Sequence, residues 1–278
     1  MATADRRDWS EAMLTRRMFT LGAAGAAGLR AETRQEKAKR LVDEAFAALG
    51  GQRFLDVKTQ IRAGRAYSFY NRQVRGMARI TIYDRFDDMQ PDPAEDWLPL
   101  KRREVYTEKG DYYALFLNGA GFEVTYRGTV PQPEDYMLRY RLASRRDIFY
   151  FMRYRMHEPG LYYYYKGTEI IDNVPADALD IVDAEGEAIT LYLRQSDGLP
   201  LQQEYLRRDP KTRIPYEEKS LFGRYKPVGD VLLPWVIRRE RDGDRVFELY
   251  ADRYEANVPL SADLFTVPNN LPMLPPNP

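Results

Sequence analysis

Residues 33–61, TRQEKAKRLVDEAFAALGGQRFLDVKTQI, contain the change of hydrophobic period that decides the fold. Thr33 and Glu36 have the spacing of a capping box, which marks a helix N-terminus. Apolar residues then recur at helical spacing until Gly50-Gly51, where the helix is expected to end. The apolar stripe consists of Leu41, Val42, Ala45, Phe46 and Leu49. Beyond Gly51 the period becomes two, so we expect an amphipathic helix that serves as a lid or buttress for a sheet.

The rest of the chain is dominated by short segments in which apolar and polar residues alternate. Few residues separate them, which favours antiparallel hairpins and meanders over crossover helices. In 122–127, FEVTYR, the alternation is unbroken. The predicted strands are 60–70, 76–86, 100–108, 111–118, 121–127, 161–172, 176–183, 188–195, 200–208, 215–226, 232–242 and 245–255. This rhythm is typical of a barrel or a sandwich, so the fold class is mainly β with helices.

One helical region is expected to interrupt the strands. Pro133-Glu134-Asp135 suits a helix start, and 135–157 has apolar groups on both faces, which predicts one long or two short helices against a large surface. Residues 259–265 are interpreted as a closing turn, and the Pro-rich end as a tail without regular structure. The expected divisions are a signal peptide over 1–31, one domain over 32–268 and the tail over 269–278.

The N-terminus has the pattern of an export signal. Arg16 and Arg17 precede a short Gly/Ala-rich apolar segment, 18–29, which is typical of a twin-arginine signal peptide. About a dozen apolar residues are too few for a membrane span, which needs roughly 20. The small residue Ala31 predicts cleavage after it, and we expect the protein in the periplasm. The alternative is an N-terminal helix that carries two arginines by chance.

Composition limits the chemistry. The 278 residues include no Cys, which excludes disulfides, Cys-ligated metals, thiol nucleophiles and an N-terminal lipidated Cys. Basic and acidic residues balance at 42 each, so nothing favours nucleic acid or an anionic membrane surface as a partner. No later apolar run approaches spanning length, so no stable membrane insertion is expected. The 21 Tyr and 12 Phe favour half-buried strands.

Residues that could carry catalysis are scarce. His157 is the single histidine and falls at an expected helix end, where capping is the simpler interpretation. A nucleophile elbow and a phosphate-binding Gly loop are both lacking, so no catalytic residue, metal or cofactor is predicted. The densest group of acidic residues, the acidic cluster, consists of Asp87, Asp88, Asp92, Glu95 and Asp96. We interpret it as a solvated loop in preference to a Ca²⁺ site. Residues 162–165 are four tyrosines, and on a strand their side chains would alternate between the two faces. They are interpreted as the exposed aromatic edge of a strand or, alternatively, as a partner-binding patch.

Several turn and strand-end motifs carry a family resemblance. They are 47–51 (AALGG) leading into 57–61 (VKTQI), 191–193 (LYL) with 197–200 (DGLP), 232–235 (LLPW), 257–260 (NVPL) and 263–268 (DLFTVP). In their order the chain resembles the LolA/LolB-type periplasmic lipoprotein carriers and related outer-membrane lipoprotein-sorting proteins. The resemblance implies an incomplete antiparallel β-barrel, a half-barrel covered by α-helices, with a hydrophobic cavity for acyl chains.

Candidate cavity residues follow from the side-chain alternation on the strands and from the covering helix. They are Tyr67, Phe69, Ile80, Ile82, Tyr113, Leu115, Leu117, Phe122, Val124, Tyr126, Phe149, Phe151, Leu191, Leu193 and Trp235. Burial of an acyl chain gains roughly 0.8 kcal/mol per methylene, so a carrier needs no reactive residue. The leading hypothesis is a carrier for acyl chains of lipids or lipoproteins.

Two other hypotheses are compatible with the same residues. One is an envelope sensor or scaffold that binds a protein partner, and the other is a carboxylate-dependent hydrolase of the envelope. Twin-arginine export carries folded cargo, commonly with a cofactor already inserted. A simple carrier gives no reason for that route, which is the observation that most favours an enzyme or a protein with a bound prosthetic group.

Overall fold

The computed structural model describes residues 31–88, 98–208 and 212–276. The chain divides into two compact units, residues 1–32 and residues 33–278. The signal-peptide prediction, with Arg16 and Arg17, lies outside the described residues, as do Asp92, Glu95 and Asp96 of the acidic cluster. No helix among the described residues of the second unit has the length and apolar character required to cross a membrane.

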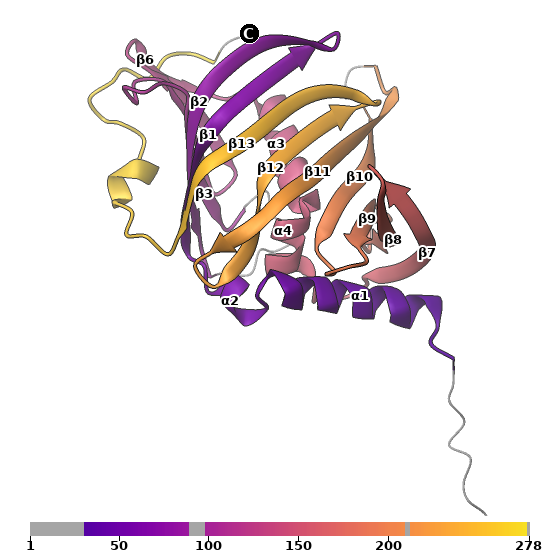
Figure 1. Cartoon of the computed structure of the whole chain (residues 1–278). Helices are drawn as coiled ribbons and strands as arrows, with labels where there is room; N and C mark the ends of the chain where they lie inside the picture. The colour runs from indigo at the N-terminus through magenta and orange to yellow at the C-terminus, as the bar shows by residue number, and fades with distance from the viewer. Residues whose placement is uncertain (1–30, 89–97, 209–211, 277–278) are drawn as a thin grey trace, which may run out of the picture. The chain divides into compact units, whose positions relative to one another are not determined.

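The second unit is built on one sheet of thirteen antiparallel strands (Figure 1). The strands are β1 (Thr59–Tyr70), β2 (Gln73–Phe86), β3 (Leu100–Val105), β4 (Tyr113–Leu117), β5 (Ala120–Thr125), β6 (Gly128–Pro131), β7 (Tyr162–Ile171), β8 (Val174–Val182), β9 (Ala188–Arg194), β10 (Pro200–Arg208), β11 (Pro215–Val228), β12 (Val231–Arg241) and β13 (Asp244–Ala256). Their spatial order is β6-β5-β4-β3-β2-β1-β13-β12-β11-β10-β9-β8-β7. Two meanders therefore meet where β1 pairs with β13, and the sheet stays open between β6 and β7. The predicted mainly β half-barrel is confirmed.

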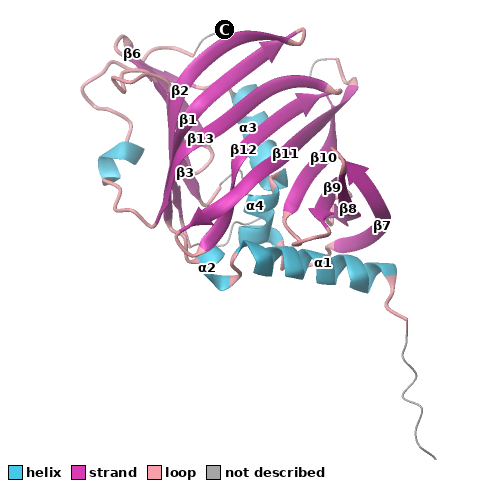
Figure 2. Cartoon of the chain, viewed as in Figure 1, coloured by secondary structure: helices cyan, strands magenta, loops and turns pink. Residues whose placement is uncertain are grey.

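Helices α1 (Arg34–Leu49) and α2 (Gln52–Leu55) lie at one end of the strands, α3 (Glu134–Arg146) and α4 (Ile148–Tyr150) lie within the curve of the sheet, and the 3₁₀ turn η2 (Ala262–Phe265) lies on its outer side (Figure 2). The π-helical turn η1 (Phe151–Arg155) follows α4. The region 135–157 is thus broken at Asp147, whose extended backbone ends α3 and whose carboxylate caps α4. Helix α2 and strand β6 were not predicted, because four residues are too few to show a hydrophobic period.

Helix α1 forms as its sequence indicates. The Glu36 backbone N–H donates to Thr33 Oγ1 at 3.1 Å, and the Thr33 N–H donates to the Glu36 carboxylate at 2.8 Å, so the capping box is confirmed. Gly50 ends the helix with φ 126°, a backbone angle that favours glycine. Val42, Ala45 and Leu49 are buried. They join α4, η1 and the inner sides of β7 to β12 in the main hydrophobic core.

The outer face of the first meander holds a second, smaller core. Val105, Tyr113, Leu115 and Val124 are buried there against the C-terminal segment, whose residues Val267 and Leu271 pack on them. Beyond these, the Thr129 N–H donates to the Pro272 carbonyl at 2.9 Å, and the Leu274 N–H donates to the Thr129 carbonyl at 2.8 Å. The segment after residue 268, expected to lack regular structure, therefore covers part of the sheet and forms one parallel bridge to β6.

We predict that Leu115→Ala lowers the free energy of unfolding by about 2–5 kcal/mol, because Leu115 is fully buried between β4 and the C-terminal segment. Urea denaturation followed by circular dichroism measures the change. The matched control is Leu206→Ala on β10, whose side chain is 68% exposed and whose loss changes stability by at most about 0.5 kcal/mol. Equal effects of the two variants would contradict the second core.

Candidate ligand cavity

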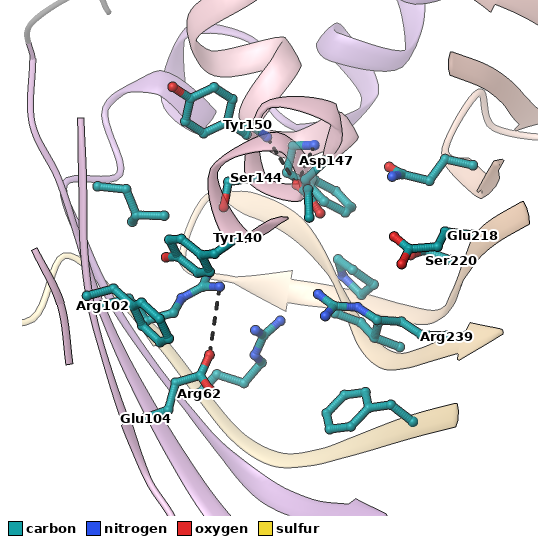
Figure 3. A pocket seen from close by; sticks show the side chains of 18 of the residues that line it. Arg62, Arg102, Glu104, Tyr140, Ser144, Asp147, Tyr150, Glu218, Ser220 and Arg239 are labelled. Carbon is teal, nitrogen blue, oxygen red and sulfur yellow. Dashed lines mark hydrogen bonds and ion pairs between the residues drawn. The ribbon is translucent and has the colours of Figure 1, made fainter. Parts of the chain in front are cut away.

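A cavity of about 490 Å³ lies between the inner face of the sheet and the α3–α4 segment (Figure 3). Cross-strand partners share a face of a sheet, so the register identifies the strand positions that face it. Gln60 pairs with Asp84, and Asp84 pairs with Arg102, which places alternate residues of β1, β2 and β3 on the inner face. On the other meander, Ser220 pairs with both Gln203 and Arg239, so these positions of β10, β11 and β12 also face inward.

One end of the cavity is mainly apolar and adjoins α2, although the Arg153 guanidinium lies over the rings of Phe54 and Phe86 there. The aromatic and aliphatic side chains that line it come from α2, the strand ends near α2 and helix α4: Phe54, Val57, Phe86, Leu100, Phe149 and Leu233. Phe149 packs edge-on against Phe222 with ring centroids 5.1 Å apart. Because all of these residues except Leu100 belong to the main core or pack against it, this end of the cavity is continuous with the hydrophobic interior.

The other end of the cavity is charged. Along β12 the inward-facing positions change from Ile237 to Arg239 and then Arg241, and Arg241 pairs with Glu218 of β11. Both arginines are exposed, so the charged end is where the cavity meets solvent. Glu218 accepts hydrogen bonds from Tyr205 at 2.9 Å and from Arg207 at 3.0 Å. Burial opposes ionisation of Glu218, but Arg207, Tyr205 and Arg241 hold its pKa below the usual value.

A buried carboxylate organises the inner wall between these ends. Asp84 has no exposed surface. It accepts a hydrogen bond from Arg102 Nε at 2.6 Å and another from Gln60 Nε2 at 2.6 Å. Burial alone would raise the pKa of Asp84, but the positive charges of Arg102 and Arg62, with the Gln60 hydrogen bond, hold the pKa below its usual value. Asp84 therefore stays ionised and fixes the positions of two cavity side chains.

Tyrosine side chains supply neutral hydrogen-bond donors at the wall. Tyr140 of α3 stacks on Phe116 with centroids 4.1 Å apart, and burial raises the pKa of its hydroxyl well above the usual value. Burial also raises the pKa of Tyr205, and Glu218 raises it further. Both phenols keep their protons at neutral pH. The Tyr205 O–H is donated to Glu218, whereas the Tyr140 hydroxyl has no hydrogen-bond partner among the described residues.

Three cavity arginines have no carboxylate within ion-pair distance among the described residues. Arg153 instead donates to the carbonyls of Phe54 and Leu55, at 2.6 and 2.9 Å, and burial lowers its pKa. Arg62 lies over the ring of Tyr254 and Arg239 over that of Phe247. The cavity therefore contains positive charge that its own acids do not neutralise.

Most of the residues expected to line a cavity lie elsewhere. Phe149 lines it. Tyr113, Leu115, Leu117, Phe122 and Val124 face the opposite side of the sheet, toward the C-terminal segment, because they have the alternate register to Phe116. The expectation that these five share the cavity face is corrected by this register.

Others of the set are core or surface residues. Phe151, Leu191 and Leu193 fill the main core, and Ile80 and Ile82 pack with Leu249 in a small cluster beside the cavity. Trp235 packs against Tyr254, with the ring centroids 6.2 Å apart. The remaining three lie away from the cavity: Tyr67 contacts Tyr250, Phe69 lies under Arg245, and Tyr126 is 73% exposed. A two-residue hydrophobic period identifies the two faces of a strand but does not show which face is concave. The prediction from the sequence therefore missed the charged residues that line the cavity.

The other singled-out residues are on the surface or at the sheet edge. His157 is exposed just after η1. Asp88 pairs with Lys58, and Asp87 accepts a hydrogen bond from Asn118 at 2.9 Å. In the part of the chain that the structure describes, no group of acids or histidine is arranged to hold a metal.

The four tyrosines lie on β7, an edge strand that contacts α1. Tyr163 is buried, and its hydroxyl donates to the Met156 carbonyl at 3.2 Å. Tyr164 accepts a hydrogen bond from Arg34 at 2.5 Å, and Lys37 lies 3.7 Å from the ring centre of Tyr165. Tyr162 is 48% exposed. Because Tyr164 and Tyr165 contact Arg34 and Lys37, the run of tyrosines packs α1 against the edge of the sheet.

We predict that Asp84→Asn lowers the free energy of unfolding by about 3–5 kcal/mol at pH 7, because Arg102 would lose its buried counter-charge. The folded-state pKa of Asp84 is lowered, so its stabilisation is present above the unfolded pKa of about 3.9 and is lost as pH falls toward the folded pKa. The difference between wild type and variant should therefore narrow below about pH 4. Urea denaturation at several pH values measures this difference in the free energy of unfolding.

The matched control is Asp252→Asn. Asp252 lies 3.3 Å from Arg79 in an exposed pair, so its loss should cost at most about 1 kcal/mol. A difference between wild type and D84N that stayed constant down to pH 3 would show that the ionised carboxylate is not what the variant removes.

Comparison with known proteins establishes the fold. No family model matches the sequence, and no curated protein matches it. Among solved structures, an outer membrane lipoprotein-sorting protein domain from Vibrio parahaemolyticus is similar, with TM-score 0.54 and 10% identity over 83% of this chain and 97% of that one. A DUF1329 family protein from Desulfovibrio piger has TM-score 0.53 and 14% identity over 82% and 97%. The chain therefore has the fold of these two proteins, an open antiparallel half-barrel with helices in its curve.

Proposed function

We propose that this chain is a periplasmic carrier that shields acyl chains of lipids or lipoproteins from water. The observation that carries the proposal is the cavity of about 490 Å³ between the sheet and α3–α4, with one end continuous with the main core. This volume lies within the range of small-molecule binding sites. The similarity to a lipoprotein-sorting domain supports the same function.

The apolar end can supply the binding energy. Each buried methylene contributes roughly 0.8 kcal/mol, so an acyl segment of about ten methylenes gains on the order of 8 kcal/mol before the costs of ordering the ligand. Leu100, Phe149 and the part of Phe86 that Arg153 leaves uncovered provide apolar surface for such a segment. Binding in this form requires no covalent chemistry and no cofactor.

The cellular role is proposed from the N-terminal pattern. Arg16 and Arg17 with the Gly/Ala-rich segment support export by the twin-arginine route, with cleavage after Ala31. In the periplasm, a protein with an acyl-binding cavity suits transfer of lipids or lipoproteins toward the outer membrane. An envelope protein that delivers or receives the cargo is part of this proposal.

We predict that Ala143→Phe weakens binding of a fluorescent long-chain fatty acid at least tenfold. Ala143 of α3 lines the cavity, and a phenyl ring there would occupy space that the acyl chain needs. Fluorescence titration of the purified protein measures the dissociation constant. The matched control is Ala120→Phe on β5, which is exposed and outside the cavity lining, and which should bind like wild type.

Wild-type protein that fails to bind acyl probes, and that carries no lipid when extracted from periplasm, would refute the carrier function. Equal binding by wild type, A143F and A120F would instead show that the acyl chain binds outside this cavity.

A further inference from the structure

We propose that the cavity selects amphiphiles with an anionic head group, carboxylate or phosphate, and that Arg62 and Arg239 recognise that group. The inference rests on the proposed acyl-binding function and adds the chemical class of the ligand. Its basis is the presence of cavity arginines without a carboxylate partner among the described residues, in a cavity of which one end is mainly apolar.

The charge balance of the lining is the first argument. Among its described residues, eight are Arg or Lys and four are Asp or Glu. Acids behind or beside the lining neutralise several of these charges: Asp84 pairs with Arg102, Asp135 with Arg139, and Glu204 and Glu217 with Lys219. Within the lining, Glu218 pairs with Arg207 and Arg241. Among the described residues, Arg62, Arg153 and Arg239 are left without a carboxylate partner, and these three would attract an anion in the cavity.

Arg62 is the second argument. It projects from β1 into the cavity (Figure 3). Its Nε is buried and has no hydrogen-bond partner in the structure. Its guanidinium lies 5.6 Å from the ring centre of Tyr254, a contact that leaves the N–H groups without acceptors. A buried donor without an acceptor is costly, and a carboxylate or phosphate oxygen against the cavity-facing part of the same guanidinium would compensate its charge.

Arg239 provides the corresponding group at the charged end. It projects from β12 into the cavity in the same view, and no carboxylate among the described residues forms an ion pair with it (Figure 3). Its neighbour on the strand, Arg238, is by contrast paired with Asp172 and Glu240, both at 3.0 Å. The two adjacent arginines thus differ: the outward one is neutralised and the inward one is not.

The position of the charges determines how an amphiphile would bind. A hydrocarbon chain gains free energy against Phe86, Leu100 and Phe149, at the end that adjoins α2. A ligand that fills the cavity removes water from the arginines as well, which is costly unless the ligand brings a compensating negative charge. A neutral lipid would impose that cost, and an anionic one would offset it.

The test compares a polyene fatty acid, whose fluorescence reports binding, with its methyl ester at pH 8. The two share one hydrocarbon chain and differ in charge. Wild type should bind the acid about tenfold to a hundredfold more tightly than the ester, the range for a charged hydrogen bond. Arg239→Gln and Arg62→Gln should reduce that preference at least threefold each without weakening ester binding, and Arg239→Lys should retain most of it.

The matched control is Arg75→Gln, an exposed arginine on β2 outside the cavity lining, which should keep the full preference. Wild type that binds acid and ester equally would overturn the inference and leave the acyl carrier standing. A preference for the acid that persists in both R62Q and R239Q would overturn the assignment of these residues. Protein that binds neither probe would refute the carrier function itself.

Competition distinguishes the two anionic groups. Dodecanoate and dodecyl phosphate are titrated against the bound probe, with inorganic phosphate alone as a third competitor. Stronger competition by dodecyl phosphate indicates a phosphate head group, and stronger competition by dodecanoate indicates a free fatty acid. If inorganic phosphate displaced the probe as effectively as dodecyl phosphate does, the inference that the ligand is an amphiphile would be overturned. The dodecyl chain would then contribute nothing to binding.

Discussion

Alternate side chains of a β-strand point to opposite faces, and in the first meander of this chain both faces of the sheet are covered around β4. On β4, Leu115 packs outward under the C-terminal segment, while Phe116 faces the cavity and stacks on Tyr140 of α3. The same strand therefore contributes to two hydrophobic layers. A shift of the register by one residue would exchange them and place the Arg102 position outside. The architecture depends on this register more than on any single contact.

The fold was predictable because its signals are local. The capping box at Thr33 and Glu36, the glycine stop at Gly50 and the period of two in twelve segments each depend on a few neighbouring residues. Strand boundaries agree within a few residues. The missed elements, α2 and β6, are four residues long and have no measurable period. Two short helices were one of the two alternatives for 135–157, but the position of the break at Asp147 was not predicted, because apolar residues continue on both sides of it.

The cavity was less predictable, because its lining depends on long-range geometry. The alternation in 122–127 identifies two faces, but only the pairing of β4 with β3 shows that Phe122 and Val124 face away from α3. Large apolar residues were also expected to mark the inside. In β1 and β3 the inward positions are Gln60, Arg62, Arg102 and Glu104, which the sequence alone would assign to solvent. Charged residues at regular strand spacing were the available signal.

Stability alone gives no reason for so much charge inside the sheet. Buried ion pairs seldom improve stability over packed apolar residues of similar volume, because desolvation offsets their attraction. The other end of the same concave surface shows the alternative, since Leu179, Leu191 and Leu193 fill it with hydrocarbon. One sheet therefore has a solid half against α1 and an open, charged half under α3. The contrast lies within a single continuous surface, and the proposed ligand would lie against the polar half, where packing alone does not account for the charged side chains.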